Sequence, residues 1–451
     1  PHPHAEPRAS LAFQVHDMTL FGIAWRNIRQ RLFTSGLTAL SLALGVALVV
    51  ATLVTGAIVK RAFESGAGLG YNMIVGAKGS PLQLVLNSVY LISKPIENIS
   101  WNTYQDFLPA ARRADGTDGR FAGSVAAAVP ICMGDYFRGY RVVGTNADYF
   151  DRLAPAGGAF RFAAGRNLRD DAFFEGVLGA TVAETLGLKV GDTFAPTHAA
   201  DDGPVHDPFT VAGILARTGT PVDRGVYVNM EGFYLQEGHA KPDAGAEPAP
   251  RADATGRPVP LPAAQREVTA ILVETASPAG MPPELMAMGL HQTINEGRDA
   301  QASMPVRVIR ELFDLFVRPL ELVLLLVTAL VVLVSAIGIL VSMVGSALER
   351  SRDVAVMRAL GARRTHVLVT VLLEAILLAV GGGVVGWAIG HGLVAALGPW
   401  ITANTGVPVS LLSAAPLAEL LLVPFLIAVA ILAALLPALA AYRTDVAKWL
   451  G

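Results

Sequence analysis

Residues 322–348, with the sequence LVLLLVTALVVLVSAIGILVSMVGSAL, contain no Lys, Arg, Asp or Glu and decide the class of fold. A helix needs roughly 20 apolar residues to cross a bilayer. Three other stretches are similarly long and uncharged: residues 32–59, 375–397 and 420–442. A soluble helix of this length would carry charge on at least one face. The sequence therefore predicts four transmembrane helices.

The composition agrees with a membrane protein. The 451 residues are 53% hydrophobic and 16% charged, whereas soluble domains carry about 25% charged residues. A formal charge of −2 provides no basic footprint for phosphate, which excludes a nucleic-acid-binding protein, and the apolar excess excludes a disordered one. The single cysteine, Cys132, excludes an internal disulfide framework and a cysteine-rich metal site.

Arginines beside the apolar stretches predict the orientation, because cytoplasmic loops are enriched in Lys and Arg. They precede the first stretch and separate the second from the third, while residues 398–418 contain no Lys or Arg. Both termini and the loop between helices 2 and 3 are therefore expected in the cytoplasm. The arginines concerned are Arg26, Arg29, Arg31, Arg350, Arg352, Arg358, Arg363 and Arg364.

The first stretch is too long for a signal peptide, and Met18 is the more plausible natural start.

The predicted fold is an α-helical membrane protein with four transmembrane helices and a large α+β extracytoplasmic domain between helices 1 and 2. Phe21, Trp25, Ile28 and Leu32 share one face of an amphipathic helix in the N-terminal segment. The predicted segments are a cytoplasmic N-terminal segment at 1–31, helix 1 at 32–59, the external domain with its stalk at 60–318, helix 2 at 319–348, a cytoplasmic loop at 349–366, helix 3 at 367–397, a short external loop at 398–418, helix 4 at 419–442 and a cytoplasmic tail at 443–451.

Within the external domain, short alternating stretches predict strands. These are residues 123–131, 138–143, 209–215, 226–229 and 267–275. Helices are expected at 179–188, closed by Gly187 or Gly191, and at 305–318, which leads directly into helix 2. Residues 238–264 are rich in Pro, Ala and Gly and predict a flexible loop.

Catalytic motifs are missing from the sequence. Nothing fits the phosphate-binding pattern G-x-x-x-x-G-K-[ST], the H-E-x-x-H pattern or the G-x-S-x-G pattern. One loop does gather side chains that a metal could use, and it is interpreted as a solvated turn, with a weak divalent-cation site as the alternative because the spacing matches no defined geometry. Its residues are His198, Asp201, Asp202, His206 and Asp207.

Three acidic residues lie next to the apolar stretches: Glu321, Glu374 and Glu419. Each neighbours an uncharged run that is long enough alone, so all three are expected at the water boundary. A carboxylate inside the membrane would instead be a functional candidate, and Glu374 is the first choice for such a proton relay.

Three glycines recur every four residues in helix 3: Gly382, Gly386 and Gly390. They fall on one face and let another helix approach closely. Packing against a helix of the same chain is favoured, and packing across a dimer is the alternative.

The loop between helices 2 and 3 predicts a short amphipathic helix, with Val354, Met357 and Gly361 on one side. Gly361 supplies a left-handed residue that would end the helix. An apolar ridge rimmed by arginines suits docking to a soluble partner. A plain loop that only fixes the membrane orientation would explain the arginines but not the ridge.

These residues are similar to those of a known family. The pattern Glu349-Arg350 to Arg358-Ala359-Leu360-Gly361-Ala362, followed by Leu373-Glu374-Ala375, resembles the FtsX-like permease domain, the membrane subunit of type VII (MacB/LolC/LolE/DevC-like) ABC transporters. The closing run from Leu436 to Arg443 resembles the last helix of that family. Residues 177–192 and 209–214 look like its MacB-type periplasmic core domain.

The resemblance implies a non-catalytic permease subunit in the bacterial inner membrane, with its large domain in the periplasm. It implies that a cytoplasmic ABC ATPase subunit uses ATP and Mg, while this chain binds no cofactor or metal. It also implies a second permease subunit, identical or different, contact with membrane lipid, a periplasmic adaptor or carrier, and no nucleic acid. The ATPase-coupling residues would be Glu349, Arg350, Arg352, Val354, Met357, Arg358, Leu360 and Gly361.

The expected function is therefore mechanotransmission: ATP hydrolysis in the partner drives export or extraction of a periplasmic or membrane-embedded substrate. The alternative is an FtsX-like transmembrane regulator that activates an external cell-wall hydrolase or other periplasmic partner. The external segment of about 259 residues favours the transporter, because such regulators have much smaller external domains.

Overall fold

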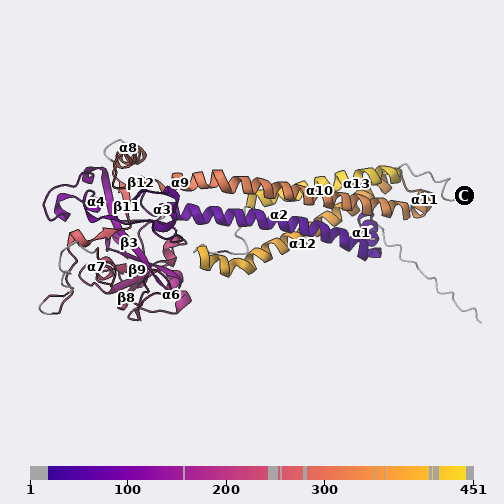
Figure 1. The fold of residues 1–451 in the computed structure, drawn as a ribbon. Helices are drawn as coiled ribbons and strands as arrows, with labels where there is room; N and C mark the ends of the chain where they lie inside the picture. Colours follow the sequence, from indigo (N-terminus) through magenta and orange to yellow (C-terminus); the bar gives the residue numbers. More distant parts are fainter. Residues whose placement is uncertain are drawn as a thin grey trace, which may run out of the picture. The chain divides into compact units, whose positions relative to one another are not determined.

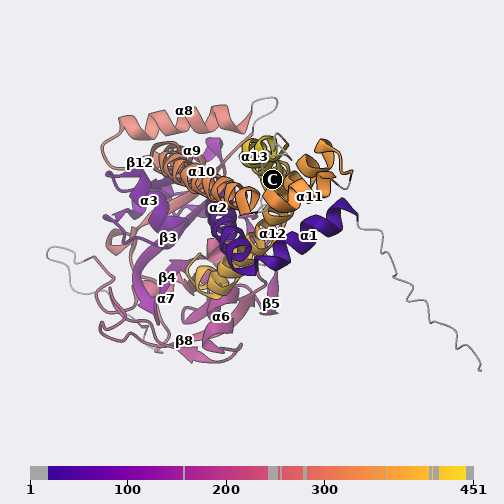
Figure 2. The same cartoon turned by 90° about the vertical axis from the view of Figure 1, so that its right-hand side faces the viewer.

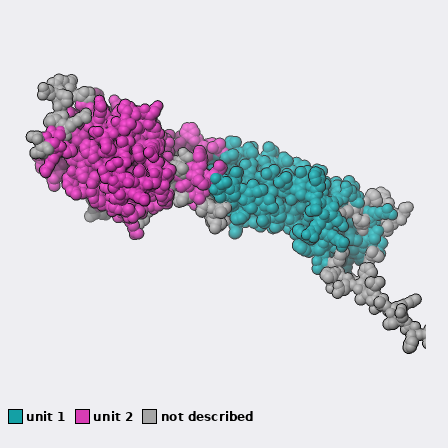
Figure 3. Space-filling model, turned by 90° about the horizontal axis from the view of Figure 1, so that it is seen from below, with its two compact units in different colours: residues 1–57, 321–396, 411–451 teal, residues 58–320, 397–410 magenta. Residues whose placement is uncertain are grey.

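A computed structural model describes residues 19–155, 158–241, 252–253, 256–277, 282–349, 351–359, 361–405, 409 and 416–442. The chain divides into two compact units, coloured separately in Figure 3. Unit 1 comprises residues 1–57, 321–396 and 411–451, and unit 2 comprises residues 58–320 and 397–410. Residues 1–18, the tail 443–451, and parts of the segments 238–264 and 398–418 (residues 242–251, 254–255, 406–408 and 410–415) lie outside the described residues.

Unit 1 is helical (Figure 1). Four helices in the described part of the chain are long and apolar enough to cross a membrane, as the four uncharged stretches predict. The helices that contribute to unit 1 are α1 (Leu20–Gln30), α2 (Leu32–Ala67), α10 (Arg318–Glu349), α11 (Ser351–Ala359), α12 (Arg364–Thr405) and α13 (Pro416–Tyr442).

Small side chains and hydrogen bonds join the long helices of unit 1. The Ser335 hydroxyl of α10 donates to the Ser41 carbonyl of α2 at 3.3 Å. Ile339 and Met343 of α10 pack with Ala375 and Leu378 of α12 and with α13 in one buried cluster. Much of the remaining apolar surface is exposed, most of all along α10. This pattern is expected of helices whose outer faces meet lipid or a partner.

Unit 2 is built on one ten-stranded sheet. Its strand order is β12-β1-β11-β3-β4-β9-β6-β8-β5, with β7 paired to β8, and β10 pairs β2 separately. Most neighbours are antiparallel, but β4–β9 and β6–β8 are parallel. The strands are β1 (Met73–Gly76), β2 (Ile99–Ser100), β3 (Val125–Phe137), β4 (Tyr140–Thr145), β5 (Phe162–Gly165), β6 (Glu175–Leu178), β7 (Thr193–Phe194), β8 (Phe209–Leu215), β9 (Val226–Asn229), β10 (Glu267–Val268), β11 (Ala270–Thr275) and β12 (Gln301–Ser303).

Short helices cover the sheet of unit 2 on both faces. Successive residues of one strand enter different hydrophobic clusters, as Met73 and Ile74 do, because side chains alternate across a strand. The sheet is therefore buried on both sides. The helices are α3 (Pro81–Ser88), α4 (Trp101–Gln105), α5 (Asp148–Asp151), α6 (Ala180–Leu186), α7 (Met230–Tyr234), α8 (Pro283–Glu296) and α9 (Pro305–Leu312), with 3₁₀ turns at Ala110–Arg112, Ala122–Ser124, Pro221–Arg224 and Ala263–Gln265.

Most of the predicted elements of unit 2 are confirmed. β8 and β9 have the predicted bounds, and Gly187 ends α6 with a left-handed φ of 68°. The helix predicted at 305–318 is α9 followed by a π-helical turn, Phe313–Val317, that runs into α10. The single strand predicted at 267–275 is wrong, because the chain changes partner at Thr269: β10 pairs with β2, whereas β11 pairs with β1 and β3.

Candidate functional site

The candidate coupling helix α11 packs its apolar side onto α12. Val354 is buried against Val367, with Met357 and Val371 alongside. Gly361 adopts a φ of 101°, and the amide of Ala362 donates to the carbonyl of Met357 at 3.0 Å. This is the left-handed helix end predicted for Gly361, and it turns the chain back toward α12.

The packing changes which side chains of the loop a partner could touch. Val354 is only 8% exposed, so the expectation that it forms part of an outward ridge is wrong: α12 occupies that face. Met357 and Arg358 are half-buried, while Arg352 is exposed. Among the large apolar side chains described for α11, Val356 is exposed, at 43%. Arg350 and Leu360 lie outside the described residues.

Helix α1 lies at the same end of unit 1 as α11 (Figure 2). Arg31, directly after α1, forms an ion pair with Glu349 at the end of α10. A cavity of about 150 Å³ is lined by residues of α1, α10, α11 and α12, including Asn27, Met357 and Glu374. The structure thus brings the N-terminal amphipathic helix and the 2–3 loop into one surface.

Helix α1 exposes its two aromatic side chains, while Ile28 packs against the buried cluster of Ile339 and Ala375. The Thr19 hydroxyl caps the helix by accepting from the amide of Gly22 at 3.2 Å. Ala24 is buried, whereas Phe21 is 55% and Trp25 47% exposed. Phe21, Trp25 and Leu32 of the predicted apolar face are exposed on the surface of unit 1, whereas the fourth member, Ile28, is half-buried. Such an exposed apolar surface suits either a membrane interface or a docked protein.

The three acidic residues near the apolar stretches have different surroundings. Glu374 is 4% exposed within the helices of unit 1, rather than open to water. Glu419 of α13 accepts from the Trp387 indole at 3.2 Å and lies 3.2 Å from the His391 imidazole, both on α12. The Glu321 carboxylate lies near Gly56 of α2. A proton-relay role for Glu374 stays a prediction.

The glycines of α12 lie against α2. A Cβ atom added to Gly386 would stand 2.4 Å from the Ala43 carbonyl oxygen. The same addition at Gly382 would meet the Ala39 carbonyl at 2.8 Å, and at Gly390 the Ala47 carbonyl at 2.9 Å. The two backbones therefore approach too closely for any side chain here. This face of α12 is covered by a helix of the same chain.

The loop at 198–207 does not gather its own five polar residues. The Asp201 carboxylate accepts from the amide of Gly139, and Asp207 pairs through its backbone with Gln236. His198 and His206 instead meet Asp135 and His239, which the sequence interpretation did not single out. Burial lowers the pKa of His206, which favours the neutral imidazole.

Two protein families match the chain, and together they cover most of it. The MacB-like periplasmic core domain matches residues 35–282, more than half of the chain. The FtsX-like permease C-terminal domain matches residues 325–446. The chain belongs to the FtsX-like permease family. Within this family of ABC permeases, the MacB-like match covers α2 and most of unit 2, and the FtsX-like match covers α10 to α13.

Similarity to individual proteins is lower. The macrolide export ATP-binding/permease protein MacB of Azoarcus sp. (strain BH72) is 25% identical over 422 residues, which are 88% of this chain and 54% of that protein. This FtsX-like permease therefore spans about half the length of that relative. The periplasmic region of MacB from Actinobacillus actinomycetemcomitans gives a TM-score of 0.31 at 11% identity, over 56% of this chain and 97% of that one.

Proposed function

We propose that this permease is the membrane subunit of an ABC transporter of the mechanotransmission type. ATP hydrolysis by a partner ATPase would be coupled to the export or extraction of a periplasmic or membrane-embedded substrate. Membership of the FtsX-like family supports the permease role, and the MacB-like core domain supports an action outside the cytoplasm. The 451 residues contain no Walker A motif, and the proposal assigns ATP hydrolysis to a separate subunit.

The surface shared by α1 and α11 is the observation that carries the proposal. It combines exposed apolar side chains, Trp25 and Val356, with exposed arginines, Arg26, Arg29 and Arg352. A basic rim around a few apolar anchors suits a soluble protein partner with acidic borders. Because basic loops stay in the cytoplasm, this surface would face the compartment where ATP is available, with unit 2 in the periplasm of a cell with an inner membrane.

The first test changes the exposed anchor of α11. Loss of a central apolar anchor often costs about 2 kcal/mol or more, whereas loss of a rim charge costs little. Val356→Asp should therefore reduce co-purification of the partner ATPase by roughly 30-fold. Arg352→Ala should reduce it only a few-fold. Membrane insertion should survive in both variants, because neither position lies in a spanning helix.

Val190→Asp is the matched control. Val190 has the same 43% exposure as Val356 but lies in unit 2. The Val190→Asp variant should co-purify with the partner ATPase as fully as the unchanged chain does. If Val356→Asp and Val190→Asp bind the ATPase equally well, α11 is not the docking element, and Trp25→Ala on α1 becomes the decisive variant.

A second readout separates the transporter from the alternative regulator. For a transporter, ATP hydrolysis by the purified complex should rise when extracts of periplasmic or lipid substrates are added. A regulator should instead raise the activity of a cell-wall hydrolase in the presence of ATP. The size of unit 2, which runs from residue 58 to residue 320 with a ten-stranded sheet, favours the transporter.

A further inference from the structure

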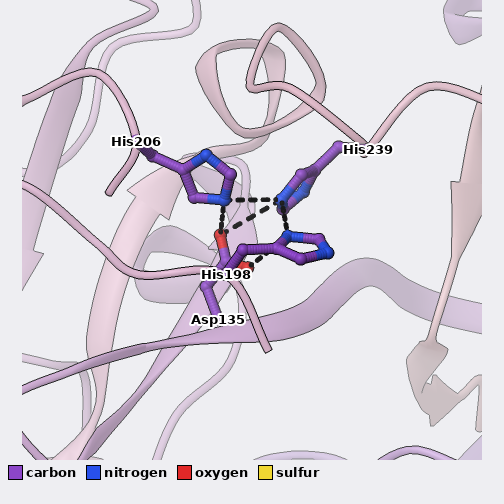
Figure 4. Close-up of side chains that lie close together, drawn as sticks. All are labelled: Asp135, His198, His206 and His239. Carbon is purple, nitrogen blue, oxygen red and sulfur yellow. Dashed lines mark hydrogen bonds and ion pairs between the residues drawn. The ribbon is translucent and has the colours of Figure 1, made fainter. Parts of the chain in front are cut away.

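Four polar side chains from separate parts of unit 2 converge on one point (Figure 4). Asp135 lies near the end of β3, His198 and His206 lie between β7 and β8, and His239 follows α7. Their ligand-type atoms all lie within 4.8 Å of one another. None of the four belongs to unit 1 or to the surface of α1 and α11.

The backbone around Asp135 directs this carboxylate into the protein. β3 and β4 pair at Met133↔Val143 and again at Tyr136↔Arg141, so two residues of β3 stand opposite one of β4. This is a β-bulge at Gly134 and Asp135, a device that often re-aims a side chain beside a site. The Asp135 side chain is 1% exposed.

The two loop histidines are held next to the bulge by backbone hydrogen bonds. The amides of Tyr136 and Thr197 each donate to the carbonyl of the other, at 3.0 and 2.8 Å. The amide of His198 donates to the Pro204 carbonyl at 2.9 Å, which folds the loop back so that His198 and His206 meet. His239 is positioned from the other side by ring contact with Phe233, with centroids 4.2 Å apart.

Five distances between ligand-type atoms are close to the edges of a small coordination polyhedron, and all of these atoms lie within 4.8 Å of one another. Asp135 Oδ2 lies 3.3 Å from both His206 Nε2 and His239 Nε2, and Asp135 Oδ1 lies 3.5 Å from His198 Nδ1. His239 Nε2 lies 3.2 Å from His198 Nδ1 and 3.1 Å from His206 Nε2. Zinc–ligand bonds of about 2.0–2.1 Å at tetrahedral angles place neighbouring ligand atoms roughly 3.3 Å apart.

The cluster is poorly satisfied by hydrogen bonds alone. Both carboxylate oxygens of Asp135 are buried, and neither has a hydrogen-bond partner of good geometry among the described residues; only the three imidazole nitrogens lie near them, at 3.3–3.5 Å. A neutral imidazole has one N–H and one lone pair, so three ring nitrogens that face each other cannot all donate and accept favourably. A cation at the centre would accept every lone pair and balance the buried negative charge.

We propose that Asp135, His198, His206 and His239 bind one divalent transition-metal ion, and that this ion is Zn²⁺. Three imidazole nitrogens and one carboxylate oxygen suit Zn²⁺, whereas Ca²⁺ and Mg²⁺ require six or more oxygen ligands. Tetrahedral coordination, the usual geometry of protein-bound Zn²⁺, would also disfavour Cu²⁺, which prefers square-planar or tetragonal geometry. The site is additional to the proposed permease function and does not depend on it.

The metal would reach this site from the surface. The His198 side chain is 40% exposed, while those of His206 and His239 are 4% and 5% exposed. A cavity of about 370 Å³ borders His198 and His239 and is also lined by Lys241 and Glu267. The partly exposed His198 therefore provides an entry path for the ion to the three buried ligands.

The test uses the full chain, purified in detergent and stripped of metal with a chelator. Titration with Zn²⁺ against a chromophoric chelator should give one tight site per chain. Substitution with Co²⁺ should give the intense visible absorption of a four-coordinate ion. The weak absorption of six-coordinate Co²⁺, or the absence of a tight Zn²⁺ site, would overturn the proposal.

Variants assign the ion to these residues. His239→Gln and His206→Gln should each weaken Zn²⁺ binding by more than the roughly 10- to 100-fold that loss of an outer-shell partner costs. His291→Gln is the control, because His291 is another half-buried histidine of unit 2. It lies on α8 and its side chain is hydrogen-bonded to that of Asn295. This variant should bind Zn²⁺ as tightly as the unchanged chain.

Stability measured without metal keeps the result interpretable. If His239→Gln melts at the same temperature as the unchanged chain in chelator but no longer gains stability with Zn²⁺, the ligand role stands. Retention of the tight site in a variant that combines His198→Gln, His206→Gln and His239→Gln would place the metal elsewhere, for example on the N-terminal His2, His4 and His16. None of these readouts needs ATPase or transport activity, so failure of the proposed function would leave them unaffected.

Discussion

At the scale of single residues, Cys132 illustrates how burial controls chemistry in unit 2. Its thiol is 3% exposed and donates to the Tyr234 hydroxyl at 3.2 Å, and the Tyr234 hydroxyl donates to the Glu267 carbonyl. Burial raises the pKa of Cys132 to about 12. The reactive species is the thiolate, so this cysteine is inert in the folded protein.

We expect Cys132 to react with an aromatic disulfide reagent only after unfolding. At pH 8 it carries roughly a thousandfold less thiolate than an ordinary cysteine with a pKa near 8.5. The absorbance of the released thiol should stay flat for the native chain and rise to one equivalent in denaturant. Rapid release from the native chain would mean that the site around Tyr234 opens readily.

The cluster of Asp135, His198, His206 and His239 was not predicted from the sequence. His198 and His206 are visible in one loop, but their apparent partners there, Asp201 and Asp202, are neighbours only along the chain. Asp135 reaches them through a bulge in β3, and His239 through the end of α7. Nothing local in the sequence signals either contact, because sheet pairing joins segments that are far apart in the chain.

At the scale of elements, the contact between α2 and α12 depends on the absence of side chains. Gly386→Ala places a Cβ atom 2.4 Å from a backbone oxygen, which cannot rotate away. We expect a loss of about 1–3 kcal/mol in stability, the usual cost of overpacking. Thermal unfolding in mild detergent, followed by the loss of helical circular dichroism, measures it.

Gly392→Ala is the control for this substitution. It lies on the same helix, and an added Cβ atom would meet nothing within 4 Å. Because alanine favours helix over glycine by about 1 kcal/mol, Gly392→Ala should be neutral or stabilising. Equal melting temperatures for the two variants would contradict the close contact of α12 with α2.

The glycine spacing was readable from the sequence because its period is local to one helix. The sequence favoured a helix of the same chain as the partner but did not identify which; the structure shows it to be α2, where Ala39, Ala43 and Ala47 repeat every four residues. The burial of Val354 could not be predicted from the sequence. The same periodicity is expected for an apolar face that contacts a partner and for one that packs on α12, and the turn at Gly361 leads to the second arrangement.

At the scale of the whole molecule, membrane orientation is the property that the arginine distribution predicts. Arg352→Cys should resist a membrane-impermeant maleimide in intact cells and react after lysis. Asp299→Cys, exposed in unit 2, should react in intact cells once the outer barrier is opened. The buried Cys132 contributes no background, so the natural chain is a suitable parent. Labelling of Arg352→Cys but not Asp299→Cys in intact cells would reverse the proposed orientation.

The fold class follows from sequence far more completely than the sheet of unit 2. Uncharged runs locate the four long helices, because the hydropathy of a segment depends only on its own residues. Strands such as β8 are also located by their own alternation. Their order in the sheet is not, since β1 pairs with β11 and β12, about 200 residues away along the chain, and no property of β1 alone specifies those partners.

The ladder between α2 and α12 has one further consequence, which comes from its regularity. Gly382 sits over Ala39 and Leu42, Gly386 over Ala43 and Val46, and Gly390 over Ala47 and Val50, so each step repeats the one before. The two helices run parallel and share a four-residue period. If α12 slid along α2 by one period, about 6 Å at 1.5 Å per residue, two of the three glycines would face alanines that neighbouring glycines faced before. An interface of interlocking large side chains would have to separate before the helices could slide. The small residues of α2 and α12 instead allow the same packing at positions four residues apart.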